Sequence, residues 1–371
     1  VFDFEWGDDF SGARNFSFSK ATKEWILWRA ADDVLQGADK IEALLAGIPP
    51  TVGGIMAQYF YGHDEVGNCV AVHQKVRLCR NDGLFTWKGR IHEDLVPIGA
   101  TEVFGTADFS VKHTAGAERV RSSSERNLVI AKLEYAEKKS DPRVVFNMAN
   151  VYLALGKYNE AIKHFLEYVP MSGWDEEKYI AWCRVAHCLQ MLEQFDEAAN
   201  MYLRAVKLKP NYAEAYRGLA HCSVFLGHLG HLDHAEEYFK MTLMKQKPDS
   251  VIGWNPFEYE VAPYYELAQV YMHQNKVADA LGAVDEYITL SNGKENGQTL
   301  RAQILEMKKV SDFRDGYMEK VKELDEKGDV AGLKKFMDAL PPENQADPGL
   351  SYVRNKHFAK KTSSGRDVAI W

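Results

Sequence analysis

Two adjacent carboxylates near the start of the chain are the first residues that suggest chemistry. The short apolar run Trp25-Ile-Leu-Trp28 is suited to a buried strand, and Asp32 and Asp33 follow its carboxyl end. Open α/β sheets place their ligands at the carboxyl ends of strands. This order of residues therefore predicts a ligand site that includes Asp32 and Asp33.

A second group of side chains could hold a metal by residue type but not by spacing. It comprises Cys183, His187, Cys188, His221 and Cys222. The first three share one predicted helix and no Cys-x2-Cys pair is present, so core thiols are favoured over zinc. The chain has five cysteines, an odd number set in apolar patterns, which indicates reduced thiols and a cytoplasmic protein.

The elements that position these residues belong to a chain of 371 residues, of which 46% are hydrophobic and 26% charged. This composition is typical of folded domains rather than of disordered chains. The formal net charge of −8 argues against a general nucleic-acid binder. No stretch approaches the roughly 20 apolar residues that a membrane span needs.

The middle of the chain repeats itself with a period of 34 residues. The clearest unit starts at Tyr179, and its small and aromatic residues recur at fixed positions: Trp182, Ala186, Phe195, Ala198, Tyr202, Ala205 and Pro210. This is the tetratricopeptide pattern, in which each unit is a helix pair that buries its apolar face only against its neighbours. We therefore predict an all-α tetratricopeptide-repeat solenoid over residues 126–345, with capping helices at 298–309, 316–326 and 330–340.

The first helix of each unit would line a concave groove. The polar residues expected to face it are Asn150, His187, Arg217, His221 and Gln269. One interpretation is a groove that binds a peptide or a partner protein, and the other is a spacer or a dimer contact; the sequence leaves both open.

Residues 1–125 have a different texture, with apolar runs separated by glycine-rich turns, which predicts an α/β domain. A helix is expected at 17–22. Two strands are expected at 53–61 and 70–79, joined by a polar turn at 62–68.

Several motifs in this region agree in order and spacing with a known family. They are Phe4-Glu-Trp6-Gly-Asp-Asp9-Phe-Ser-Gly-Ala13-Arg14-Asn15, Trp25-Ile-Leu-Trp28, Asp32-Asp33, Arg77-Leu-Cys-Arg80 and Gly89-Arg-Ile-His92-Glu93. Together they resemble the later half of a bacterial family 2 glycosyltransferase, in which tetratricopeptide repeats commonly follow the transferase domain. The resemblance implies a partial GT-A domain that uses a nucleotide-sugar donor and a glycan or protein acceptor.

The resemblance also implies roles for individual residues. Mg²⁺ or Mn²⁺ would be held by Asp32 and His113, although the first carboxylate of the family's Asp-x-Asp motif is Ala30 in this chain. Glu93, with His92, matches the family's candidate general base. Donor binding would involve Arg14, Asn15 and Asp33, with a structural salt bridge as the alternative for Arg14.

The family's nucleotide-binding beginning does not precede Val1, and residues 346–371 resemble a linker and the start of a further domain. Both ends are therefore expected to be cut from something longer. Two functions follow: a glycosyltransferase fragment whose repeats bind acceptor or partner, or a catalytically degenerate transferase-like protein that acts as a protein-binding scaffold.

Overall fold

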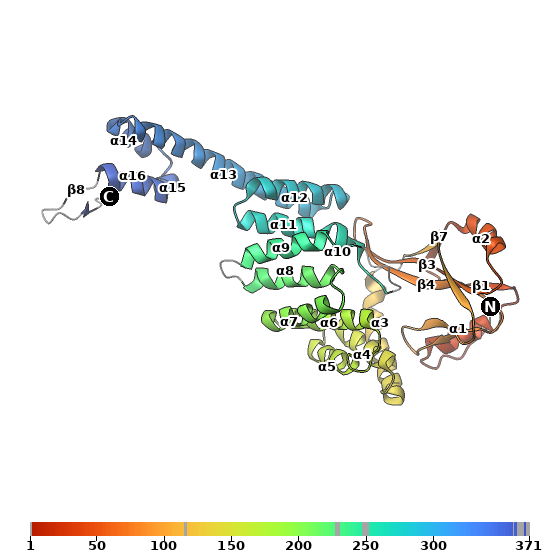
Figure 1. Ribbon diagram of the computed structural model, residues 1–371. Helices are drawn as coiled ribbons and strands as arrows, with labels where there is room; N and C mark the ends of the chain where they lie inside the picture. Colours follow the sequence, from red (N-terminus) through yellow and green to blue (C-terminus); the bar gives the residue numbers. More distant parts are fainter. Residues whose placement is uncertain are drawn as a thin grey trace.

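The computed structural model describes residues 2–114, 117–226, 231–246, 252–358, 360–361 and 367–368. A sheet-containing part formed by the first residues lies beside a stack of antiparallel helices, and one long helix leads away from that stack to a small helical cluster near the C-terminus (Figure 1). The predicted order, an α/β region followed by an all-α solenoid, is therefore present.

A five-stranded mixed sheet forms the centre of the N-terminal part, in the order β1-β4-β3-β7-β2. Its strands are β1 (Trp25–Leu27), β2 (Asp33–Gln36), β3 (Val52–His63), β4 (Cys69–Arg80) and β7 (Glu102–His113). β3 and β4 form the predicted antiparallel hairpin, while β3 and β7 run parallel. Between Val76 and Leu78 the pairing with β3 skips one residue, so Arg77 sits in a bulge. Bulges re-aim side chains, often near functional sites.

One face of this sheet is apolar and covered, and the other is polar. Ile55, Leu78 and Phe109 on the covered face pack against α2 (Ile41–Gly47), which follows the short 3-10 helix Ala38–Lys40. A second small sheet, β5 (Phe85–Lys88) with β6 (Asp94–Pro97), packs beside α1 (Phe10–Phe18). The helix predicted at 17–22 is therefore wrong in position: it starts after Asp9, whose carboxylate caps it by accepting from the Gly12 amide.

The repeats form four helix pairs, as predicted. After α3 (Ala117–Lys138), the pairs are α4 (Pro142–Ala154) with α5 (Tyr158–Tyr168), α6 (Asp175–Met191) with α7 (Phe195–Leu208), α8 (Glu214–Leu226) with α9 (His231–Leu243), and α11 (Ala262–His273) with α12 (Val277–Leu290). A short helix, α10 (Pro256–Glu260), comes between the third and fourth pairs. The turn before α9 includes residues 227–230, which lie outside the described residues.

Alanine at two positions of every unit lets the paired helices approach closely. All eight are fully buried: Ala149, Ala161, Ala186, Ala198, Ala220, Ala235, Ala268 and Ala280. Aromatic residues such as Phe165, Tyr202 and Phe239 fill the space between neighbouring units. The close-packed interior leaves no room for larger side chains at the alanine positions.

The C-terminal helices differ from the expectation. Residues 298–309 and 316–326, predicted as two helices, belong to one helix, α13 (Glu295–Glu326). A single glycine such as Gly316 costs about 1 kcal/mol in a helix and does not end it. The remaining helices are α14 (Val330–Asp338), α15 (Pro342–Gln345) and α16 (Pro348–Phe358), and two short strands, β8 (Lys360–Lys361) and β9 (Asp367–Val368), pair with each other.

Part of the linker predicted from residue 346 onwards is a helix, α16. Leu350 and Val353 of α16 are buried in a cluster with Tyr317, Leu333 and Met337. Most of 348–358 therefore belongs to the helical cap, because its apolar residues complete that cluster. No helix among the described residues has both the length and the apolar character needed to cross a membrane.

The sheet-containing part contacts the helical part through several segments, including the β5–β6 loop and the turn of the β3–β4 hairpin. Ile91, in the loop between β5 and β6, is buried among Ile130, Met148 and Val151 of α3 and α4. Much later in the chain, the loop after α12 meets the turn of the β3–β4 hairpin, where Lys294 Nζ lies 2.8 Å from Asp64 Oδ2. The polar sheet face is therefore held opposite the repeats.

Candidate functional site

The polar sheet face is built around Asp33, at the start of β2. The Asp33 side chain is fully buried, and both of its oxygens are occupied. Oδ1 accepts from the Tyr59 hydroxyl and from His113 Nδ1, each at 3.0 Å, while Oδ2 accepts from the Ala30 amide at 2.9 Å and lies 3.4 Å from Arg77 Nη1. Asp33 is therefore a fully engaged anion at the centre of the face.

The charge state of this cluster follows from its partners. Burial alone would raise the pKa of Asp33, but the hydrogen bonds from Ala30, His113 and Tyr59 and the charge of Arg77 outweigh it and leave the pKa below its usual value. Burial and the adjacent Asp33 raise the pKa of the Tyr59 hydroxyl. Asp33 is therefore ionised and Tyr59 protonated at neutral pH, as their hydrogen bond requires.

Arg77, in the β4 bulge, lies between two aromatic rings. Its Cζ is 3.9 Å from the ring centre of Trp28 and 3.9 Å from that of Tyr59. The residue is fully buried, and within the described part of the chain its Nε and Nη2 have no hydrogen-bond partner. Cation–π contacts and the carboxylate of Asp33 therefore compensate the buried charge.

The same stack continues on the other side of Trp28. The guanidinium of Arg14 in α1 lies 4.8 Å from the Trp28 ring centre and 4.6 Å from that of Trp87. Arg14 Nε donates to Glu93 Oε1 at 2.5 Å. A ladder of alternating cations and rings therefore connects Glu93 with Asp33, and we call it the arginine–aromatic ladder.

Asp32 and His113 lie at the far end of this ladder. His113 Nδ1 is 3.7 Å from Asp32 Oδ1, and one possible ligand atom from each of Asp32, Asp33 and His113 lies within 4.8 Å of the others. The Tyr61 ring, which is 50% exposed, stacks on His113 with centroids 5.0 Å apart. Three potential metal ligands and an open aromatic ring therefore meet at one end of the sheet.

Two further predicted site residues have structural contacts. Asn15 binds β5 through both ends of its amide: Oδ1 accepts from the Trp87 amide at 2.9 Å, and Nδ2 donates to the Trp87 carbonyl at 3.0 Å. His92 lies in the loop before β6 with a φ of 52°, in the left-handed region. Desolvation lowers the pKa of His92, and the charge of the adjacent Glu93 opposes that effect.

The structure thus brings most of the predicted residues to one sheet face. Asp32, Asp33 and His113 meet directly, and Arg14 pairs with Glu93, so the salt bridge foreseen for Arg14 is present. Their assigned chemical roles stay predictions. Sequence reasoning missed Tyr59, Arg77 and Trp28 as the groups that join the two ends; the period-two spacing of Tyr59 and Tyr61 in a predicted strand was an available signal.

The concave side of the repeats is partly covered by the chain's own segment 252–260, which we call the strap. The Val72 and Trp254 backbones exchange two hydrogen bonds of 3.0 Å each, so the strap adds to β4. Gly253 lies against the His73 ring, and a Cβ there would come within 2.2 Å of it. Glycine is required because only its missing side chain allows this approach.

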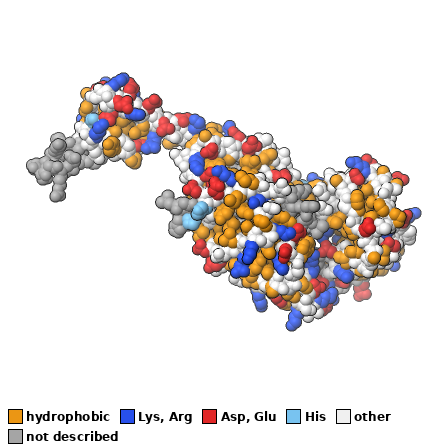
Figure 2. Space-filling model, viewed as in Figure 1, with side chains coloured by type: hydrophobic (Ala, Val, Ile, Leu, Met, Phe, Trp, Pro, Cys, Tyr) orange, Lys and Arg blue, Asp and Glu red, His pale blue; other side chains and the backbone are white. Residues whose placement is uncertain are grey.

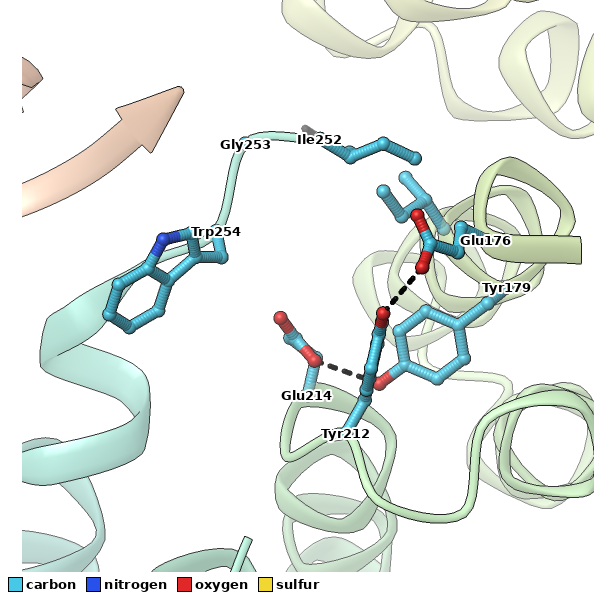
Figure 3. Close-up of a pocket in the computed structure, with 8 residues that line it drawn as sticks. Glu176, Tyr179, Tyr212, Glu214, Ile252, Gly253 and Trp254 are labelled. Carbon is cyan, nitrogen blue, oxygen red and sulfur yellow. Dashed lines mark hydrogen bonds between the residues drawn. The ribbon is translucent and has the colours of Figure 1, made fainter. Parts of the chain in front are cut away.

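Phenolic hydroxyls fasten the strap to α6 and α8. Figure 3 shows Trp254 and Gly253 passing over the ends of these helices, with Glu214 directed at Tyr179. Glu214 Oε2 accepts from the hydroxyls of Tyr179 and Tyr259, each at 2.8 Å. Those hydroxyls in turn accept from the Ala215 and Ala213 amides. Burial raises the pKa of Glu214, and the two hydroxyls oppose that effect.

The predicted groove residues fall into two sets. Arg217 and His221 are engaged within the protein, since Arg217 Nη2 lies 2.6 Å and His221 Nε2 2.9 Å from Glu266 Oε1, and Arg217 also pairs with Glu258 of the strap. His187 and Gln269 are exposed, and Asn150 is half-buried. Whether any of them binds a partner stays a prediction.

Known proteins resemble the helical part of the chain. The tetratricopeptide repeat family model matches residues 142–169 and 179–212. The chain contains tetratricopeptide repeats. Superkiller complex protein 3 of Mus musculus is 29% identical over 87 residues, which are 24% of this chain and 5% of that protein. The chain therefore spans a small fraction of that relative.

Solved structures resemble the chain over about half its length. MamA is 16% identical with a TM-score of 0.39, covering 47% of this chain and 92% of that one. YrrB, titled a TPR protein with an unusual peptide-binding site, is 21% identical with a TM-score of 0.37. The match covers 52% of this chain and 86% of that one. A thermophilic TPR protein of Thermus thermophilus is 16% identical with a TM-score of 0.37, and the match covers 51% of this chain and 93% of that one. The family model matches only repeat residues, and none of these findings identifies residues 1–125 as a glycosyltransferase domain.

Proposed function

We propose that this protein is a binding scaffold whose tetratricopeptide repeats hold an extended segment of a partner protein. The repeats carry this proposal: stacked helix pairs create an extended concave surface, which is the feature such solenoids use for binding. Apolar side chains gather over the solenoid face seen in Figure 2, interspersed with charged ones.

The favoured binding surface is the part of the groove that α4 and α6 line, which the strap does not occupy. The strap and its contacts to Arg217 occupy the concave side near α8 and α11. His187 of α6 remains exposed, and Asn150 of α4 half-exposed. A partner segment would therefore lie along α4 and α6, opposite the polar sheet face.

A peptide selection on the whole chain tests this proposal. A random 12-residue library is selected against the purified protein, and the enriched peptides are measured by fluorescence anisotropy. We expect His187→Trp, which fills the groove with a ring, to weaken their binding at least tenfold. Leu203→Trp is the matched control, because Leu203 is 50% exposed on the second helix of the same unit.

Two results would reject the scaffold function. One is the absence of any enriched peptide that competes with its unlabelled form. The other is a set of peptides whose affinity is unchanged by His187→Trp or is equally reduced by Leu203→Trp. Circular dichroism at 222 nm verifies that both variants keep the helical content of the wild type.

The cluster at Asp32 favours a second candidate function. We propose that the N-terminal part is a transferase-like domain that acts on a nucleotide sugar, with a divalent cation at this cluster. The supporting observation is the convergence of Asp32, Asp33 and His113 on one end of the polar face. Asp33 is occupied by its own partners, so Asp32 and His113 Nε2 would supply the ligands for Mg²⁺ or Mn²⁺.

A cation bound there would neutralise the negative charge that develops on a diphosphate leaving group. Asp32 would orient it, and Asp33 would fix the His113 ring by accepting from Nδ1 at 3.0 Å. Glu93, paired with Arg14, would need that ion pair to open before it could take a proton from an acceptor hydroxyl.

Calorimetric titration of the whole chain with Mn²⁺ tests this second function. Because Ala30 supplies no ligand, we expect weak Mn²⁺ binding alone and stronger binding when a nucleoside diphosphate is also present. Asp32→Asn should abolish the increase, whereas Asp39→Asn, an exposed aspartate nearby in the chain, should not. Tight binding without nucleotide, or no effect of Asp32→Asn, would disprove this assignment.

A further inference from the structure

A small cavity lies where the strap crosses the first turns of α6 and α8. Its walls include the side chains of Tyr179, Tyr212 and Trp254, and Glu214 stands among them (Figure 3). The volume open to the centre of a water-sized sphere is about 10 Å³, which is room for one water-sized group. Glu214 and Tyr212 are only partly buried, so the cavity can be reached from the surface. It is therefore a small aromatic site with a carboxylate in its wall.

The Glu214 carboxylate has hydrogen-bond donors but no cation. Both phenolic hydroxyls, of Tyr179 and Tyr259, donate to Oε2, and no other side chain of the described residues donates to this carboxylate. Figure 3 shows the other oxygen on the side of Trp254. Within the part of the chain that the structure describes, no cationic side chain lies at ion-pair distance from Glu214. The carboxylate therefore meets the cavity without a counter-charge.

Two cations of the surrounding helices are held by other carboxylates. Lys209 Nζ lies 3.3 Å from Oε1 of Glu176, which lines the cavity, and Arg217 Nη1 lies 3.2 Å from Oε1 of Glu258 in the strap. The negative charge of Glu258 also acts on Glu214. Removing a carboxylate from water without a counter-charge costs free energy, so the cavity favours a cation over a neutral or anionic group.

The walls of the cavity restrict which cation fits. Tyrosine and tryptophan rings attract cations to their faces. The lysine ammonium is a compact charge with three donors at the end of a flexible stem, whereas the guanidinium of arginine is a broad plane. Room for one water-sized group suits the first and excludes the second, and it excludes a trimethylated ammonium as well. The cavity therefore matches a primary ammonium group.

The cavity shares a face of α6 with the favoured binding surface. Ile180 lines the cavity, and His187 follows seven residues later, two turns along the same face and about 10 Å along the helix axis. We infer that this cavity binds a primary ammonium group, supplied by a lysine side chain of the partner segment, with Glu214 as its counter-charge. This inference rests on the scaffold function proposed above and specifies its ligand. The ammonium would donate a charge-assisted hydrogen bond to the carboxylate.

The test uses four peptides of glycine and serine that differ only in one central residue: lysine, Nε-acetyl-lysine, Nε-trimethyl-lysine or arginine. Each carries fluorescein at its N-terminus and an amide at its C-terminus, so the central side chain is the only cationic group. Fluorescence anisotropy with the whole chain should show the lysine peptide binding about tenfold more tightly than each of the others, equivalent to about 1.4 kcal/mol. Butylammonium, which has the same headgroup without a peptide, should displace the lysine peptide only in large excess.

Glu214→Gln removes the charge and keeps an oxygen that can accept from Tyr179 and Tyr259. It should weaken binding of the lysine peptide about tenfold and leave the acetyl-lysine peptide unchanged, because only the first peptide carries a charge. A variant that misfolds would weaken both peptides equally, so the comparison separates the two causes. Asp175→Asn is the matched control. Asp175 is exposed in the first turn of α6 and does not line the cavity, and its replacement should affect neither peptide.

The inference is overturned if the lysine peptide binds no better than the acetyl-lysine or trimethyl-lysine peptide, or if Glu214→Gln leaves its affinity unchanged or weakens all four peptides equally. It is equally overturned if Asp175→Asn causes the same loss. Displacement by butylammonium at equal concentration would reject a partner segment as the source of the ammonium. Library peptides that lose affinity with His187→Trp yet bind Glu214→Gln as they bind the wild type would leave the scaffold function intact and reject this ligand.

Discussion

Replacing Asp33 by asparagine isolates the contribution of the buried ion pair at the centre of the polar face. Both side chains of the Asp33–Arg77 pair are 0% exposed, and among the described residues no other carboxylate is paired with Arg77. Asparagine retains an oxygen that can accept from Tyr59, so the main change is the loss of the counter-charge. Breaking one partner of a buried pair costs about 3–5 kcal/mol. We expect Asp33→Asn to lower the free energy of unfolding by that amount.

Urea denaturation followed by tryptophan fluorescence measures this loss, because Trp28 and Trp87 are rings of the arginine–aromatic ladder. The double variant Asp33→Asn/Arg77→Met should recover at least about 1 kcal/mol of the loss, since it removes the uncompensated charge as well. A loss below about 1 kcal/mol for Asp33→Asn alone would refute the view that Asp33 balances Arg77. A double variant no more stable than the single one would refute it as well.

Three further predictions concern the junction and the repeats. Gly253→Ala should speed amide hydrogen exchange in the strap, because the added Cβ would clash with the His73 ring. Adding His73→Ala to the same chain should restore the protection. An exchange rate that Gly253→Ala leaves unchanged would contradict the contact. Burial, then the charges of Lys75 and Arg184, lower the pKa of His73 to about 4. Its folded-state pKa thus lies below the unfolded value. The stability that the neutral ring contributes is therefore complete above about pH 6.5 and is lost as the pH falls towards 4, by up to about 3 kcal/mol. The prediction is wrong if the urea midpoint of a His73→Phe variant changes with pH in the same way as that of the wild type. Ala198→Leu should cost about 1–3 kcal/mol by overpacking, and an unchanged thermal melt would reject the repeat register.

The repeats were predictable because their spacing is a direct consequence of packing. Close helix contacts need alanine at two fixed positions, and all eight such alanines are indeed fully buried. The hairpin of β3 and β4 was predictable because two apolar runs flank a polar turn. The helix boundaries were predicted less accurately, since α1 starts after the Asp9 cap and α13 continues through Gly316. Both features follow from local rules that the sequence interpretation did not apply: Asp9 accepts from the amide three residues further on, and a single glycine does not end a helix.

The sequence predicted the residues at the two ends of the site but not the residues that connect them. Asp32 and Asp33 were chosen by their position after an apolar run and His113 by a family resemblance. The sheet order places them together because β2 pairs with β7 from Asp33 to His113. The burial of Asp33 could not be read from the sequence. It depends on Arg77, which a bulge in β4 directs towards Trp28 and Tyr59.

The strap shows a second limit of local reasoning. Residues 254–257 lie in the connection between the third and fourth helix pairs, and Trp254 pairs with Val72 of β4, far earlier in the chain. No periodicity records such a contact. Its consequence for function is that the groove is shorter than the repeats alone would give, because the strap occupies the concave side near α8 and α11.

One strand connects the groove to the carboxylate cluster. β4 supplies Val72 to the strap, Lys75 to an ion pair with Asp94 of β6, and Arg77 to the arginine–aromatic ladder. With a rise of about 3.3 Å per residue, these contacts span only about 17 Å along a strand. The strap therefore pairs with the same strand that supplies the cation paired with Asp33. Binding in the groove and chemistry on the polar face, where both occur, must share the rigidity of β4, so a variant that disturbs the strap is expected to alter both.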